Sequence, residues 1–101
     1  LGVACIPGAY TPAEMIRADR AGAALVKLFP APANGPEYVK QILGPLPHLK
    51  IVPTAGVDEK NAAAYLRAGA WAVGFTTSLF SAADIEARAR ELLAACWQGV
   101  S

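Results

Sequence analysis

The sequence lacks a long uninterrupted hydrophobic run, although hydrophobic residues make up 54% of its 101 residues. A membrane-spanning helix requires about 20 apolar residues free of charge and proline, and no stretch approaches that length. Charge of a single sign is lacking too, since nine Lys and Arg are spread evenly among eight Asp and Glu. Without a basic stripe, nucleic acid and anionic membrane surfaces are poor partners. We therefore predict a soluble protein.

Cysteine and histidine are scarce as well. The two cysteines, Cys5 and Cys96, lie in apolar segments without CxxC or metal-ligand spacing. This usage is typical of buried thiols in a reducing compartment and, with no visible signal peptide, predicts a cytoplasmic location. The single histidine, His48, precedes an apolar run and is expected in a surface loop. The chain opens at Leu1 within an apolar run, which favours a piece of a longer protein.

One pattern recurs four times: a short apolar run, a turn rich in Gly, Pro and Thr, and an amphipathic helical stretch. The apolar runs cover residues 1–6, 23–29, 49–52 and 70–75. The expected helices cover residues 12–21, 36–43, 59–68 and 82–97. Short connections between alternating strands and helices imply parallel strands with right-handed crossovers.

Three of the expected helices have recognisable starts. Thr11, followed three residues later by Glu14, forms a capping box. Asp58 is expected to cap the third helix. Ser81 with Asp84 forms a second capping box before the last helix.

Two architectures fit this order of elements: an open flavodoxin-like sheet, and half of an eight-stranded barrel. A dinucleotide-binding open sheet carries a GxGxxG turn after its first strand. Residues 7–11 read Pro-Gly-Ala-Tyr-Thr instead, so that signal is absent. We expect an α/β fold built as one parallel (βα)4 unit.

Lys27 is an ionisable side chain inside an apolar run. It lies in Ala-Leu-Val-Lys-Leu-Phe-Pro at residues 24–30, a strand expected to be covered on both faces. Burying an ammonium ion without a partner is costly, so such lysines are paired or reactive. A desolvated amine is more readily neutral, and the neutral amine is the nucleophile of Schiff-base chemistry. The alternative is a lysine that extends from the strand end to solvent.

The turns after the third and fourth runs are suited to an anion. They read Thr-Ala-Gly at residues 54–56 and Gly-Phe-Thr-Thr-Ser at residues 74–78. Backbone N–H groups and hydroxyls can hold a phosphate at a helix start, and glycine permits its close approach. Taken alone, the same residues favour the alternative, ordinary turn formation and helix capping.

Several short motifs occur in a fixed order along the chain. They are Ile-Pro-Gly at 6–8, Thr-Pro-Ala-Glu at 11–14, Val-Lys-Leu-Phe-Pro-Ala at 26–31, Gly-Pro at 44–45, Val-Pro-Thr-Ala-Gly-Val at 52–57 and Ala-Val-Gly at 72–74. Together they resemble the KDPG/KHG aldolase family, class I aldolases that cleave 2-keto-3-deoxy-6-phosphogluconate or 4-hydroxy-2-oxoglutarate. The resemblance implies that residues 1–101 are one partial domain, the second half of a TIM barrel with strands five to eight.

By this resemblance, Lys27 is the Schiff-base lysine of a Lys-x-Phe-Pro motif, with Phe29 lining the pocket beside it and Pro7 at the pocket wall. The resemblance implies cleavage of a small keto acid through a lysine imine, giving pyruvate and an aldehyde. It implies neither a metal nor an organic cofactor. It also implies a homo-oligomer, which in this family is a trimer.

The resemblance places Thr54 near the substrate carboxylate, and Gly56 and Thr76 at phosphate-site positions. Two residues depart from the family pattern. Ala55 replaces a glycine, so its Cβ either crowds a phosphate or requires a different backbone conformation. Thr76 replaces a serine, keeping the hydroxyl and adding a methyl. Preference for a phosphorylated substrate is therefore left open.

The family's general acid/base, a glutamate on an early strand, has no counterpart in this sequence. The carboxylates present fit helix starts and solvated faces, so we expect the acid/base to lie outside the chain. Two alternatives stay open beside the aldolase. One is a non-catalytic half-barrel that acts only by pairing with a missing N-terminal half or with another copy. The other is an open-sheet phosphate-binding module.

Overall fold

The computed structural model describes residues 2–100, which form a parallel sheet flanked by helices. The strands are β1 (Gly8–Ala9), β2 (Val26–Leu28) and β3 (Ile51–Pro53), in the order β1-β2-β3. The helices are α1 (Pro12–Arg20), α2 (Gly35–Leu43), α3 (Ala62–Arg67), α4 (Thr77–Phe80) and α5 (Ile85–Val100). Both strand pairs are parallel, which confirms the predicted α/β class.

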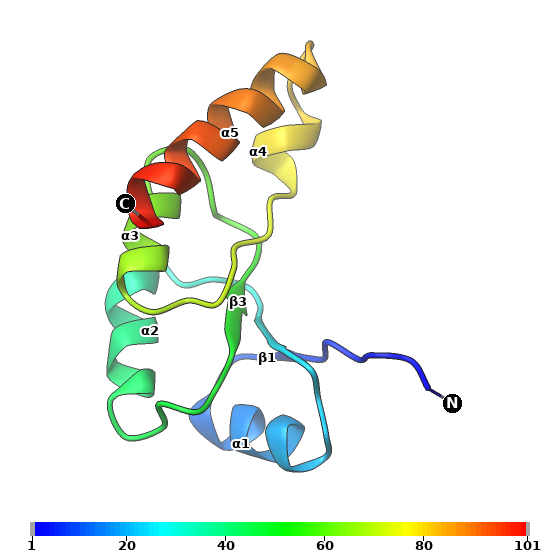
Figure 1. Cartoon of the computed structure of the whole chain (residues 1–101), viewed down its shortest axis with the longest axis vertical. Helices are drawn as coiled ribbons and strands as arrows, with labels where there is room; N and C mark the ends of the chain where they lie inside the picture. Colours follow the sequence, from blue (N-terminus) through cyan, green and yellow to red (C-terminus); the bar gives the residue numbers. More distant parts are fainter. Residues whose placement is uncertain (1, 101) are drawn as a thin grey trace.

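Side chains along β2 alternate between the two faces of the sheet, and this alternation decides which face the helices cover. Val26 and Leu28 are 1% and 0% exposed and belong to one core with side chains of α1, α2 and α3. Lys27, between them, points to the other side and is only partly buried. We call this opposite side, which carries Lys27 and Val52, the free face of the sheet. Figure 1 shows the N-terminal segment extending away from the helices.

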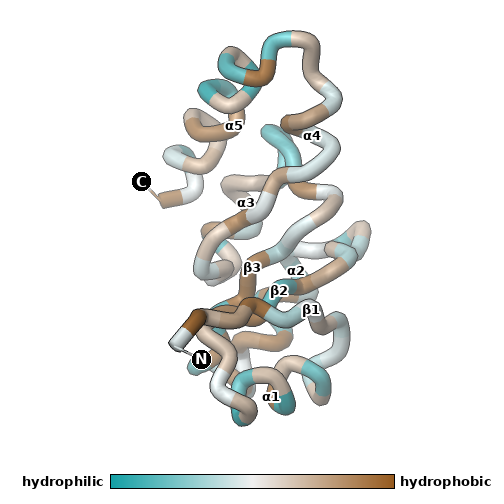
Figure 2. The backbone as a smooth tube through the Cα atoms, turned by 90° about the vertical axis from the view of Figure 1, so that its right-hand side faces the viewer, coloured by the Kyte–Doolittle hydropathy of each residue, from teal (hydrophilic) through white to brown (hydrophobic). Residues whose placement is uncertain are grey.

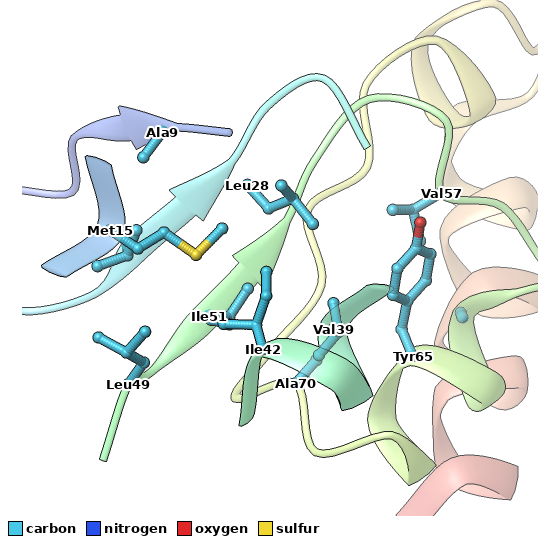
Figure 3. Close-up of a cluster of buried hydrophobic side chains, with 12 residues drawn as sticks. Ala9, Met15, Leu28, Val39, Ile42, Leu49, Ile51, Val57, Tyr65 and Ala70 are labelled. Atoms are coloured by element: carbon cyan, nitrogen blue, oxygen red, sulfur yellow. The ribbon is translucent and has the colours of Figure 1, made fainter. Parts of the chain in front are cut away.

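The core lies between the sheet and the three helices that follow its strands. Figure 3 shows Met15 of α1, Ile42 of α2 and Tyr65 of α3 gathered along β2 and β3. Burial of each side chain of this size stabilises the fold by roughly 1.5–3 kcal/mol. In Figure 2, hydrophilic residues mark the outer turns of α1, whereas hydrophobic stretches run through the strands.

The first strand is not where the apolar run 1–6 predicts it, and within that run Leu1 lies outside the described residues. The strand forms later, at β1, because the carbonyls of Pro7 and Ala9 accept hydrogen bonds from N–H groups of the second run, at 2.9 and 3.1 Å. Segment 7–10, expected as a turn, is therefore extended.

The predicted (βα)4 unit is not observed in full, because the run 70–75 forms no regular strand. The N–H groups of Trp71 and Gly74 donate to two carbonyls of β3 at 2.8 and 2.9 Å, and an isolated parallel bridge joins Gly74 to Thr54. The two acceptor carbonyls are two residues apart in β3, whereas the two donor N–H groups are three residues apart in the run. The extra residue makes the run bulge away from regular strand pairing. The described residues thus form a three-stranded sheet with a bridged fourth segment.

The start of α1 confirms the first predicted cap. The hydroxyl of Thr11 accepts a hydrogen bond from the backbone N–H of Glu14, and the Glu14 carboxylate accepts one from the N–H of Thr11 at 2.9 Å. Asp58 accepts bonds from the N–H groups of Lys60 and Asn61, and α3 begins just after them.

The last helix differs from its prediction because the chain turns once more before it. Residues 77–80 form the short α4, which ends at Ser81, so Ser81 does not begin a helix. Asp84 is the cap of α5 instead, since its carboxylate accepts a hydrogen bond from the N–H of Ala87 at 3.1 Å.

Two compositional predictions have different outcomes. Within residues 2–100, no helix combines the length and the hydrophobicity needed to cross a membrane. The expectation of buried thiols is wrong for Cys5, which is exposed, because its segment precedes β1 and leaves the core. Cys96 on α5 is partly buried, and this burial raises the pKa of its thiol.

A glycine permits α2 and α3 to approach each other closely. A Cβ built on Gly35 would lie 1.6 Å from the hydroxyl oxygen of Tyr65, and the Tyr65 side chain is 1% exposed. The buried ring therefore occupies the space that any larger residue at position 35 would need.

The first prediction follows from this approach. Replacing Gly35 with alanine should lower the free energy of unfolding by about 1–3 kcal/mol, since a buried ring must shift. Gly44→Ala is the matched control, because a Cβ there meets its nearest atom at 3.5 Å. It should not destabilise the fold, and by restricting the unfolded chain it should add up to about 1 kcal/mol. Urea unfolding measures both, and equal effects would contradict the packing argument.

The second prediction concerns the cap of α1. Hydrogen bonds from the N–H and hydroxyl of Thr11 and from the N–H of Tyr10 lower the pKa of Glu14 from its usual 4.5. Because the folded-state pKa is the lower one, the stabilisation is complete above pH 4.5 and is lost as pH falls through the folded value. The difference in Tm between wild type and Glu14→Gln should therefore shrink on acidification. A difference independent of pH would contradict this assignment.

Candidate active site

Lys27 lies in the middle of the central strand. Its Cα is paired with Gly8 of β1 on one side and with Val52 of β3 on the other. Its backbone N–H donates to the carbonyl of Pro7 at 2.9 Å. Pairing on both sides holds the backbone of Lys27 firmly, while its side chain stands on the free face. Pro7 thus contacts Lys27 through the backbone.

The side chain of Lys27 packs over the ring of Phe29. Its Nζ lies 4.8 Å from the ring centroid, within the range of a cation–π contact. Phe29 is 49% exposed, so one face of the ring and the lysine together present a surface on the free face. Lys27 and Phe29, which were predicted to lie side by side, are therefore in contact.

Thr54 follows β3 directly and is buried, at 8% exposure. Its N–H donates to the carbonyl of Leu28 at 3.0 Å, which continues the pairing with β2. Opposite lies Gly74, where a Cβ would stand 2.7 Å from the Thr54 Oγ1. The glycine therefore leaves the space that the threonine hydroxyl occupies.

The two residues after Thr54 turn the chain in left-handed conformations. Ala55 has a φ of 65° and Gly56 a φ of 85°. An L-residue in this region costs roughly 1–2 kcal/mol, so Ala55 adopts a glycine-like backbone at a cost in stability. The turn is held by the N–H of Ala31, which donates to the carbonyl of Thr54 at 3.2 Å, and by Asn61, which donates to that of Gly56 at 2.8 Å.

Thr76 is exposed at the start of α4. Its carbonyl accepts hydrogen bonds from the N–H groups of Leu79 and Phe80, at 3.0 and 2.9 Å. Its hydroxyl makes no capping hydrogen bond to this helix. Within residues 2–100, the Thr76 hydroxyl therefore does not have the ordinary capping role that the sequence also allowed.

The carboxylates of the described residues are engaged away from Lys27. Their partners are Thr11 for Glu14, His48 for Asp19, Gln41 for Glu37, Lys60 and Asn61 for Asp58, Arg88 for Glu59 and Glu91, Ala87 for Asp84, and Arg90 for Glu86. None of them forms an ion pair with Lys27. Glu14 and Asp84 accept backbone hydrogen bonds at helix starts, as predicted, whereas the ion pairs of Glu59 and Glu91 with Arg88 were not predicted.

Sequence reasoning missed several groups that shape this end of the molecule. The Tyr38 hydroxyl donates to the carbonyl of Tyr10 at 2.7 Å, and the two rings stack with centroids 5.6 Å apart. Burial raises the pKa of Tyr38, so it stays a donor at neutral pH. The Ser78 hydroxyl donates to the carbonyl of Val57, and Arg88 donates to the carbonyl of Ser78. No local pattern signals these contacts, since their partners lie 10 or more residues away.

Comparison with known proteins identifies the family of this chain. Residues 1–96 match the family model described as KDPG and KHG aldolase. The chain belongs to this family. A relative in the KDPG and KHG aldolase family, the probable 2-dehydro-3-deoxy-6-phosphogalactonate aldolase of Rhizobium meliloti (strain 1021), is 39% identical over 93% of this chain and 47% of its own length. The 2-dehydro-3-deoxy-6-phosphogalactonate aldolase of Escherichia coli (strain K12) is 33% identical, over 93% of this chain and 46% of its own length.

A solved structure has a fold similar to that of this chain. The structure described as native KDPGal superposes with a TM-score of 0.79 at 31% identity, covering 98% of this chain and 48% of that chain. The chain thus spans about half the length of the curated relatives and of the solved structure that it matches.

The third prediction concerns the left-handed alanine. Ala55→Gly should raise the free energy of unfolding by up to about 1 kcal/mol, because relief of strain exceeds the entropy that glycine adds to the unfolded chain. Ala21→Gly is the control, since Ala21 has a φ of −78°. That change should destabilise by roughly 0.5–1 kcal/mol. Chemical unfolding of both variants checks the opposite signs, and destabilisation by both would contradict the strain.

Proposed function

We propose that this chain supplies the Schiff-base half of a class I aldolase, with Lys27 as the lysine that forms the imine. The observation that carries the proposal is the position of Lys27, a nucleophilic side chain on the free face between Gly8 and Val52. Family membership supports it, because the relatives are named as aldolases, which are carbon–carbon lyases. The family match does not favour an open-sheet phosphate-binding module.

The proposed route cleaves a 2-keto-4-hydroxy acid. The neutral amine of Lys27 attacks the keto carbon, and loss of water gives a protonated imine. As a base removes the proton of the 4-hydroxyl, the C3–C4 bond breaks and its electron pair moves into the imine, so an aldehyde leaves and an enamine stays. Protonation of the enamine and hydrolysis release pyruvate and the free amine. The imine is itself the electron sink, so this route needs no metal or organic cofactor.

The neighbours of Lys27 have separate roles in the proposal. Phe29 covers one side of the amine and limits its contact with water, while Pro7 forms the wall beside it. Thr54 is proposed to bind near the substrate carboxylate.

The distal part of the substrate is assigned to the two loops at the carboxyl ends. Gly56 and Thr76 are proposed to bind this part, including a phosphate where one is present. Ala55 lies between Thr54 and Gly56, and its left-handed backbone keeps the turn in a form that glycine also adopts.

The proposal requires a general acid/base from outside the described residues, since their carboxylates are engaged elsewhere. We place residues 1–101 as a half-barrel, a (βα)4 unit equivalent to strands five to eight, completed by a complementary half that brings this carboxylate. The half-length match to the relatives supports this arrangement. A cytoplasmic homotrimer of complete barrels stays a prediction of the sequence resemblance.

The fourth prediction tests Lys27 directly. Incubation with pyruvate and borohydride should attach one pyruvate-derived group, which peptide mapping by mass spectrometry should locate at Lys27. Lys27→Ala and Lys27→Met should both lose the adduct. Lys50→Ala is the matched control, because Lys50 also lies over an aromatic ring, with its Nζ 5.0 Å from the Trp71 centroid.

The control variant should keep the adduct at the wild-type level. Circular dichroism must show that each variant is folded before its mass spectrum is compared. An adduct that persists in both Lys27 variants would overturn the assignment. A folded wild type without any adduct would contradict imine formation by this chain itself.

A further inference from the structure

The two loops that carry the proposed distal binding residues come from different parts of the chain. Residues 54–57 follow β3, and residues 76–81 follow the bridged run. Regular strand pairing does not join them beyond the single bridge at Gly74. Their relative position therefore depends on side-chain contacts, and one such contact is the hydroxyl of Ser78, which donates to the carbonyl of Val57 at 2.7 Å.

Arg88 on α5 holds the other side of the second loop. Its Nε donates to the carbonyl of Ser78 at 2.8 Å. One terminal nitrogen lies 2.6 Å from the carboxylate of Glu59, in the segment that follows the first loop. The other lies 3.0 Å from Glu91, one turn along α5. The guanidinium thus connects α5 with both loop regions at once.

The electrostatics of this cross-link suit a structural role. The Arg88 side chain is 20% exposed, which screens its ion pairs less than those at a fully solvated surface. Hydrogen bonds from its own backbone and from Arg88 lower the pKa of Glu59, and the carboxylates of Glu59 and Glu91 raise that of Arg88. All three nitrogens of the guanidinium have partners within the chain, so Arg88 is not disposed to bind an anion itself.

We propose that Arg88 is a positioning residue that holds the loops 54–57 and 76–81 together, so that Gly56 and Thr76 bind the same anionic part of the substrate. The inference rests on the proposed function of these loops. The proposal assigns recognition of the distal part of the substrate and formation of the imine to different parts of the chain. Lys27 is held by strand pairing on both sides and makes no contact with the Arg88 cross-link. Loss of Arg88 should impair distal recognition and leave imine formation intact.

The experiment compares Arg88→Met with Arg90→Met. Arg90 is two residues further along α5, its side chain is 75% exposed, and it pairs with Glu86 on the same helix. It therefore serves as a control for loss of an arginine without loss of the cross-link. Three measurements are made on each folded variant: inorganic phosphate affinity by NMR titration, amide hydrogen exchange, and the rate of pyruvate trapping at Lys27.

In Arg88→Met, phosphate affinity should fall about five- to tenfold, and exchange at the N–H groups of Leu79 and Phe80 should accelerate. Arg90→Met should leave both within about twofold of wild type. The trapping rate should be unchanged in both variants. Arg88→Lys should recover part of the affinity, because an ammonium can still pair with Glu59 but cannot reproduce the fork that also reaches Ser78.

Each contrary result overturns a stated part of the inference. Unchanged hydrogen exchange in Arg88→Met would overturn the cross-link, and unchanged phosphate affinity would overturn its role in recognition. A wild type that binds no phosphate would overturn the anionic partner. An equal loss of phosphate affinity and of trapping would show a general disturbance rather than positioning. If wild type fails to trap pyruvate, imine formation by this chain itself is contradicted, while phosphate affinity and exchange still decide the role of Arg88.

Discussion

The rest of the structure depends on the two-sided pairing of β2. Val26 and Leu28 are almost completely buried against the helices, so a shift of one residue in register would expose both and force Lys27 into the core. Because this shift in register is costly, each residue of β2 stays on its own face of the sheet. The placement of a nucleophilic amine on the free face is therefore a consequence of burying its two neighbours, and the cation–π contact with Phe29 adds to it.

Towards the carboxyl ends of the strands, hydrogen bonds from side chains, rather than strand pairing, hold the backbone in place. The carbonyl of Tyr10 is held by Tyr38, that of Gly56 by Asn61, and that of Val57 by Ser78. Hydrogen bonds of this kind satisfy loop carbonyls that strand pairing does not reach. Ala55 has a left-handed backbone, so the turn after Thr54 carries local strain.

The acidic residues of the described chain are bound to partners other than Lys27. Carboxylates at helix starts accept N–H bonds, as Glu14 and Asp84 do, and those on helix surfaces pair with arginines, as Glu86 does. These tasks stabilise the packing of helices against the sheet and leave no acid facing Lys27 among the described residues.

The sequence by itself determined what depends on near neighbours: the capped start of α1 at Thr11, the apolar runs that became β2 and β3, and a lysine within one of them. These follow from side chains a few residues apart, whose chemistry acts on the local backbone. Only the tertiary structure decided the late start of β1 and the bulge in the run 70–75, because pairing partners set strand limits. It also decided the pairing of Arg88 with Glu59, which are 29 residues apart, because folding alone brings such distant charges together.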